Sequence, residues 1–344
     1  MKELKGLATG VGSLPFVEAQ KAVDLVLRCV PEAPFWPQLP KRDAREGMIA
    51  QFSENLPGLK IDSGTLRFIP QDKEKELELF YEKFIDQDLP YFKISQDYAQ
   101  GLYAFYQRLK TADLSKVEFI KCQVTGPFTF CAGISDSGGN SILHDKVLMQ
   151  AMAKGLSMKA LWQLELFKEF GKKIIMFFDE PYLAAVGSAY TPVNRNEVID
   201  VFSELTASLK ERDALVGIHC CGNTDWSMLT DASGVDIINF DAFDFQERFL
   251  LYPDNIKSFL KKGGIICWGI VPTQRYDNGQ APEGLAQKIR SGLDILAKKG
   301  INRQLLVERL MISPACGLGS LDAQDAGGIF SLLNQTSAFI RKNL

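Results

Sequence analysis

Residues 173–181 read KIIMFFDEP, in which five apolar residues in succession lead to two carboxylates and a proline. A strand that is apolar on both faces is buried on both sides, which is typical of a parallel sheet covered by helices. In barrels built from such strands, the side chains that act on a ligand gather at the carboxyl ends. We therefore expect residues 173–181 to form a central strand that leads into a functional site.

Seven further segments show the same pattern of a short apolar run closed by turn or polar residues. They are LATGVGSLP (7–15), APFWPQLP (33–40), VEFIKCQVTGP (117–127), LVGIHCCGN (215–223), VDIINFDAF (235–243), GGIICWGIVP (263–272) and RLMISPACG (309–317). Segments with helical periodicity separate them, such as the one that contains Leu285, Ile289, Leu293 and Leu296 and is followed by Gly300 at a C-cap position. Eight strands alternating with helices predict an α/β fold, a single (β/α)8 TIM barrel. No G-x-G-x-x-G follows the first strand, which disfavours a dinucleotide-binding sheet.

The interval between the second and third runs is too long for one crossover helix. It contains GLKIDSGTLRFIP (58–70), which has the pattern of a hairpin with a turn at Ser63-Gly64. No linker rich in Pro, Gly or Ser divides the chain. We therefore expect residues 1–344 to form one barrel domain with a hairpin-like insertion around 58–70, after the second strand.

Composition excludes several classes of protein. The chain has 344 residues, 46% of them hydrophobic, and 39 basic against 42 acidic residues give a net charge of −3. No basic run marks a nucleic-acid partner. The amino terminus lacks the apolar region of a signal peptide, and no stretch approaches the ~18 apolar residues of a membrane span, so we expect no membrane and a cytoplasmic location. Seven cysteines, an odd number, do not suggest a disulfide framework.

One of only two histidines lies beside cysteines at a strand end. His219 and Cys221 are two residues apart on a predicted strand, so their side chains project to the same face, while Cys220 points the opposite way. Cys316, at the end of another predicted strand, would add a second thiolate on the same rim. One imidazole and two thiolates are a ligand set expected for zinc with an open position for substrate, which indicates catalysis.

These residues also carry a family resemblance. The chain resembles the catalytic barrel of cobalamin-independent methionine synthase, within the superfamily of uroporphyrinogen decarboxylase and the coenzyme M methyltransferases. The resemblance rests on an ordered set of motifs that spans nearly the whole chain: GVGS (10–13), TGP (125–127), DEP (179–181), HCCGN (219–223) and SPACGL (313–318).

The resemblance implies a role for each matching residue. His219, Cys221 and Cys316 would bind Zn2+, and Asp241 stands where the family usually has a glutamate that completes the coordination. Ser13 and Asp179 would hold the carboxylate and amine of homocysteine. Two departures concern the methyl donor: we expect no second barrel like that of the full-length enzyme, because 344 residues leave no room for it, and no folate-stacking tryptophan follows TGP. The donor is therefore either methyltetrahydrofolate or a methylated corrinoid protein.

The expected function is a zinc-dependent methyltransferase that acts on homocysteine or a similar small thiol. One alternative is a uroporphyrinogen decarboxylase-like enzyme, which would use cations such as Lys41, Arg42 and Arg45 to bind several carboxylates. Another is a thiol- or corrinoid-binding protein without turnover. For Glu180 the sequence favours neither a catalytic nor a helix-capping role, and TGP fits a tight turn after its strand.

Overall fold

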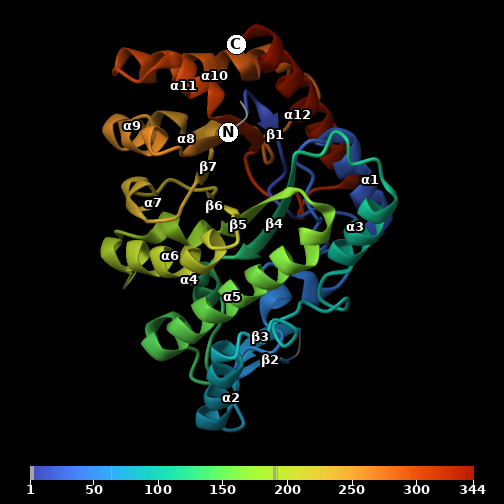
Figure 1. Ribbon diagram of the computed structural model, residues 1–344, viewed down its shortest axis with the longest axis vertical. Coiled ribbons are helices and arrows are strands. Elements are labelled where there is room, and N and C mark those ends of the chain that lie inside the picture. Colours follow the sequence, from blue (N-terminus) through green and yellow to red (C-terminus); the bar gives the residue numbers. More distant parts are fainter. Residues whose placement is uncertain (1–3, 63, 189–190, 192) are drawn as a thin grey trace.

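The computed structural model describes residues 4–62, 64–188, 191 and 193–344, and within them seven parallel strands form one curled sheet (Figure 1). Its strands are β1 (Leu7–Ala8), β4 (Phe119–Thr125), β5 (Lys173–Asp179), β6 (Leu215–Cys220), β7 (Ile237–Asp241), β8 (Ile265–Val271) and β9 (Leu310–Pro314). Their order is β1-β9-β8-β7-β6-β5-β4. Each strand lies within one of the apolar runs that predicted it.

The expected second strand, residues 33–40, is the exception. This segment forms only isolated parallel bridges, of Gln38 with Ser13 and of Phe35 with Lys121 on β4. Its sequence contains three prolines, at positions 34, 37 and 40. A proline has no N–H to donate to a ladder, so a regular strand cannot form here. The segment therefore spans the interval between β1 and β4 as irregular chain, and the prediction of an eighth regular strand was wrong.

The predicted insertion is present as the antiparallel hairpin of β2 (Leu59–Asp62) and β3 (Thr65–Phe68). Ser63 of the expected turn lies outside the described residues, and Gly64 has a φ of +79°, a conformation that favours glycine. The amide of Phe68 donates to the carbonyl of Ser135 at 3.0 Å, which ties the hairpin to the loop that follows helix α4 (Pro127–Ala132). Figure 1 shows the hairpin together with helix α2 at one end of the molecule.

Helices surround the sheet (Figure 1). The α-helices are α1 (Ala19–Cys29), α2 (Lys73–Ile85), α3 (Gln100–Thr111), α4 (Pro127–Ala132), α5 (Lys146–Phe167), α6 (Arg195–Lys210), α7 (Ser227–Asp231), α8 (Ala242–Phe249), α9 (Pro253–Lys261), α10 (Pro282–Lys298), α11 (Arg303–Glu308) and α12 (Ala323–Asn343). The 3-10 helices are η1 (Ala44–Glu46), η2 (Ala50–Phe52), η3 (Ile142–His144), η4 (Lys168–Phe170) and η5 (Pro181–Ala185). Among the described helices, none has the length and apolar character needed to cross a bilayer.

Two hydrophobic clusters cover the two faces of the sheet. The larger one includes Val124, Phe178 and Ile218 and packs between the sheet and the helices. The smaller one includes the alternate strand residues Ile175 and Leu215 and lies on the other face. Toward the carboxyl ends of the strands this second face turns polar. On this face, apolar side chains lie beneath the polar ones, and the candidate site lies among the polar side chains.

Candidate metal and substrate site

Strand register places three polar side chains in one row at the carboxyl ends of β5, β6 and β7. Asp179 pairs with His219, and His219 pairs with Asn239. Paired residues of adjacent strands have side chains on the same face of the sheet. All three are buried, with exposed fractions of 6%, 3% and 3%. Buried polar groups need specific partners, so this row determines much of the chemistry of the site.

The structure brings together His219, Cys221 and Cys316. One ligand atom from each lies within 4.8 Å of the others. Among the described residues, these three form a group that could hold a metal ion. Cys221 follows the end of β6 and Cys316 follows the end of β9, so residues far apart in the chain meet on one rim. Cys220 is fully buried on the helix-covered face, as the alternation of side chains predicts.

The His219 imidazole is held in one orientation. Its Nδ1 lies 2.7 Å from Oδ1 of Asn239. Its Nε2 is buried and has no hydrogen-bond partner among the described residues. A buried nitrogen without a partner is costly unless something else binds it, and metal-ligating histidines commonly use the other ring nitrogen for an outer hydrogen bond. The unpartnered Nε2 therefore fits a metal ligand.

The two sulfur atoms have complementary protonation. A hydrogen bond from Cys221 lowers the pKa of Cys316 to about 4, with a further contribution from His219. Donation of that same hydrogen bond raises the pKa of Cys221, and burial adds to the effect. Cys316 is thus the more acidic sulfur of the pair. Two cysteine sulfurs beside an imidazole are the donor chemistry that suits zinc.

Asp241 caps a helix in this structure. Its carboxylate accepts a hydrogen bond from the amide of Asp244 at 2.9 Å and caps helix α8. It lies outside the group of ligand atoms that are all within 4.8 Å of one another. Burial raises its pKa, and the negative charge of Asp244 adds to this, with a smaller contribution from Cys316.

Asp179 is buried with an unsatisfied oxygen. Its Oδ1 has no hydrogen-bond partner in the part of the chain that the structure describes. Burial raises the pKa of Asp179, while the nearby charges of Lys121 and His219 lower it. A buried carboxylate with a free acceptor at the carboxyl end of a parallel strand is suited to bind a cationic group such as an ammonium.

Lys121 is a buried cation on β4 beneath this rim. Its Nζ donates to the carbonyl of Val11 and to Oε1 of Gln123, the latter at 3.1 Å. The ammonium also lies 5.1 Å from the centre of the Phe177 ring. Burial lowers its pKa to about 8, and Asp179 opposes that shift. Lys121 therefore supplies positive charge next to Asp179 and holds the segment that leads to Ser13.

Ser13 lies against the turn that follows Cys316. Its Oγ accepts a hydrogen bond from the amide of Gly319 at 3.2 Å. A Cβ at Gly317 would lie 2.3 Å from that oxygen, so the close approach requires glycine. The first strand segment and the turn after β9 thus share one edge of the site.

Glu180, adjacent to Asp179, stabilises the fold. It is fully buried, and its carboxylate accepts hydrogen bonds from the amides of Phe128 and Thr129 at 2.9 and 2.8 Å. These amides belong to the first turn of α4, where a carboxylate also interacts favourably with the helix dipole. Gly126 is the N-cap of the same helix, and a Cβ there would lie 2.2 Å from Cγ of Glu180. The TGP motif therefore begins a helix around a buried carboxylate.

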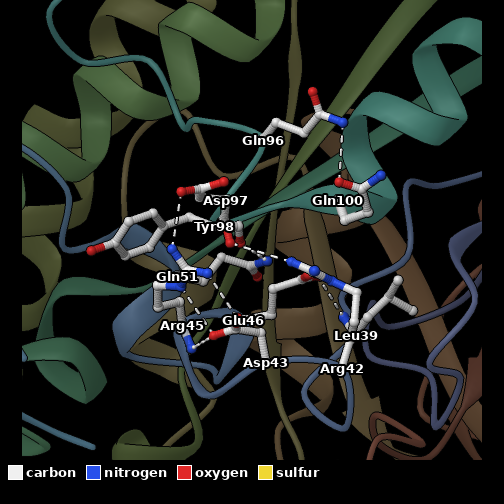
Figure 2. Close-up of polar contacts among 10 residues, drawn as sticks. All are labelled: Leu39, Arg42, Asp43, Arg45, Glu46, Gln51, Gln96, Asp97, Tyr98 and Gln100. Atoms are coloured by element: carbon white, nitrogen blue, oxygen red, sulfur yellow. Dashed lines mark hydrogen bonds and ion pairs between the residues drawn. The ribbon is translucent and has the colours of Figure 1, made fainter.

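The cations that a decarboxylase would need are paired within the chain. Arg42 forms an ion pair with Glu46, and Arg45 forms ion pairs with Asp43 at 2.8 Å and Asp97 at 3.0 Å (Figure 2). Figure 2 also shows that these contacts join the loop after residue 39 to the segment before α3. Lys41 donates to the carbonyl of Leu321. These side chains therefore hold loops together.

Sequence reasoning did not identify Asn239 or Lys121 as site residues. Both are polar residues inside largely apolar runs, IINFD and FIKCQVT, at positions that face the same side of the sheet as Asp179 and His219. A strongly polar residue at the alternation of an otherwise apolar strand is the signal that could have identified them.

The fold is shared with known enzymes. A B12-independent methionine synthase from Shewanella sp. W3-18-1, in complex with selenomethionine, superposes with a TM-score of 0.57 at 16% identity, over 99% of this chain and 98% of that one. A putative vitamin-B12 independent methionine synthase from Listeria monocytogenes superposes with a TM-score of 0.53 at 12% identity, over 94% of this chain and 86% of that one. No family model and no curated protein matches the sequence. At these identities the likeness establishes a common fold.

Proposed function

We propose that this protein is a zinc-dependent S-methyltransferase that transfers a methyl group to a small thiol, with homocysteine as the preferred acceptor. The observation that carries the proposal is the convergence of His219, Cys221 and Cys316 from distant parts of the chain. The shared fold with structures described as B12-independent methionine synthases supports the same reaction type.

The donor set fits zinc. His219 would contribute the unpartnered Nε2, and Cys221 and Cys316 would contribute thiolates. Bound zinc would lower the pKa of a substrate thiol so that it is present as the nucleophilic thiolate near neutral pH. Asp241 would serve as a further ligand only if its carboxylate leaves the α8 cap, because it now accepts the amide of Asp244.

The remaining residues would orient the amino-acid part of the acceptor. The unsatisfied Oδ1 of Asp179 would accept hydrogen bonds from its ammonium group. The Ser13 hydroxyl would donate to its carboxylate, since the oxygen already accepts from Gly319 and retains its proton for donation. With its ammonium and carboxylate groups held in this way, the substrate would direct its sulfur toward the metal ligands.

In the methyl transfer, the substrate sulfur attacks the methyl carbon while the bond from that carbon to the donor breaks. Positioning of the two reactants accounts for much of such catalysis. The donor would be methyltetrahydrofolate or a methylated corrinoid protein. We also propose that residues 33–40 close the curled sheet into a barrel by taking the place of an eighth strand without forming a regular ladder. Their isolated bridges reach both Ser13 and β4.

The test combines zinc content with activity. Purified protein should contain near-stoichiometric zinc and methylate homocysteine when supplied with methylcobalamin or with methyltetrahydrofolate. Cys316→Ser should lose both properties. Protein without zinc, together with a Cys316→Ser variant that behaves as wild type, would refute the proposal. Zinc with homocysteine binding but no transfer from either donor would favour a thiol-binding protein.

A further inference from the structure

The side chain of Asn239 connects the strands that carry the candidate ligands. It lies on β7, it is 3% exposed, and all its polar atoms have partners. Its Oδ1 meets Nδ1 of His219 at 2.7 Å. Its Nδ2 donates to the carbonyl of Cys267 at 2.9 Å and to Oγ of Ser313 at 2.9 Å. One amide therefore reaches β6, β8 and β9.

These contacts determine which end of the amide faces the imidazole. The carbonyl of Cys267 can only accept a hydrogen bond, so the amide nitrogen must lie on its side. Ser313 donates its own hydroxyl proton to the carbonyl of Pro314 at 2.8 Å, so its oxygen accepts from Asn239. Both amide protons are thus used, and the oxygen is left for His219.

A carbonyl oxygen facing the ring has one consequence for the proton of neutral imidazole. Oδ1 is an acceptor only, so the close contact requires Nδ1 of His219 to carry the proton. The neutral ring then has a bare Nε2, which is the atom that the structure leaves without a partner. The hydrogen bond at one ring nitrogen sets which nitrogen is available to a metal.

We propose that Asn239 is the positioning residue of the metal site: it holds the His219 proton on Nδ1 and so keeps Nε2 free to bind zinc. The inference rests on the proposed function for the identity of the metal. Asn239 also fixes Ser313 on the strand that leads to Cys316, so it orders the histidine and the distant cysteine through one side chain.

The test uses the full-length chain and nitrogen-15 NMR of histidine. The protein contains two histidines, and His144 is exposed. In the His144→Gln variant the only histidine signals are therefore those of His219. In metal-free protein, at a pH where the ring is neutral, we expect a protonated Nδ1 and a bare Nε2. Asn239→Leu should shift the proton toward Nε2 and weaken zinc binding by about 10- to 100-fold, the usual effect of losing an outer partner.

Two further variants separate orientation from general damage. Asn239→Asp retains an acceptor for the Nδ1 proton and should keep the tautomer. Thr336→Val removes a buried hydroxyl that bonds the carbonyl of Leu332 in α12, away from the site, and should change neither tautomer nor zinc affinity.

Two results would overturn the role of Asn239: a wild-type ring protonated on Nε2, or a folded Asn239→Leu variant with unchanged tautomer and zinc affinity. A wild-type protein that shows the Nδ1 proton but binds no zinc would instead refute the proposed function and leave the tautomer assignment supported.

Discussion

The adjacent cysteines at positions 220 and 221 allow a matched test of the metal site. Cys221 belongs to the group whose ligand atoms lie within 4.8 Å of one another. Cys220 is buried among the helix-side core residues, and its Sγ contacts the carbonyl of Gly222 at 3.5 Å. We expect zinc to raise the melting temperature of wild type and of Cys220→Ala, but to have little effect on Cys221→Ala.

The expected size follows from mass action. A ligand that binds only the native state at about 1,000 times its Kd adds about 4 kcal/mol to the free energy of unfolding. The unfolding entropy is about 2.1 cal/mol/K per residue, so for a chain of 344 residues a change of about 0.7 kcal/mol in the free energy of unfolding shifts the melting temperature by one degree. Zinc should therefore raise the melting temperature by about 6 °C. Loss of a direct ligand should cost more than the ~100-fold of an outer partner, which leaves a shift of about 2 °C or less.

Differential scanning calorimetry of each protein, metal-free and in the same zinc buffer, measures this shift. Comparing each variant with its own metal-free form removes the packing cost of the substitution. An equal zinc shift in Cys221→Ala and wild type would show that the cluster is not a metal site. Loss of the shift in Cys220→Ala alone would contradict the assignment of the two faces of β6.

Three further predictions address other buried charged groups. Asp179→Asn should raise the KM for homocysteine by about 10- to 100-fold, the cost of losing a charged hydrogen bond, with no change for a thiol that lacks an amine; equal effects on both thiols would contradict its role. Glu180→Gln should lower the free energy of unfolding in urea by about 1–3 kcal/mol, yet leave zinc content unchanged, because glutamine offers one acceptor oxygen where the amides of Phe128 and Thr129 use two. Lys159 is fully buried, and burial lowers its pKa from 10.5 to about 7. Between these pH values the unfolded chain binds more protons at this site than the native one, so Lys159 should add to the free energy of unfolding as the pH rises from 7 to 10, by up to about 4 kcal/mol. In urea titrations, Lys159→Met should remove this contribution from the pH dependence; an unchanged slope would argue against it.

Most of the sheet could be predicted because continuous apolar runs have few other uses in a folded chain. The run at 33–40 is also largely apolar but contains Pro34, Pro37 and Pro40, and the missing N–H groups outweigh its hydrophobicity. The first run also forms only a two-residue strand, Leu7–Ala8. Local patterns indicate burial well, but they do not show how many ladder hydrogen bonds a segment can make.

The candidate site was predictable where spacing alone determines direction. His219 and Cys221 share a face because they are two residues apart, and the structure places them together. The role of Glu180 could not be predicted from sequence, since the first turn of α4 that it caps comes from a segment about fifty residues earlier. Asn239 was missed for the same reason: its partners depend on the register of three strands.

The closeness of Cys221 and Cys316 has a consequence for the protein when it lacks metal. Two cysteine sulfurs that lie this close together can be joined by an oxidant into a disulfide. Oxidation would remove two ligands at once and block the approach of a substrate sulfur. Metal occupancy would therefore protect the protein against oxidative inactivation as well as serve its chemistry, and preparations made without reductant should lose the capacity to be reloaded until the bridge is reduced.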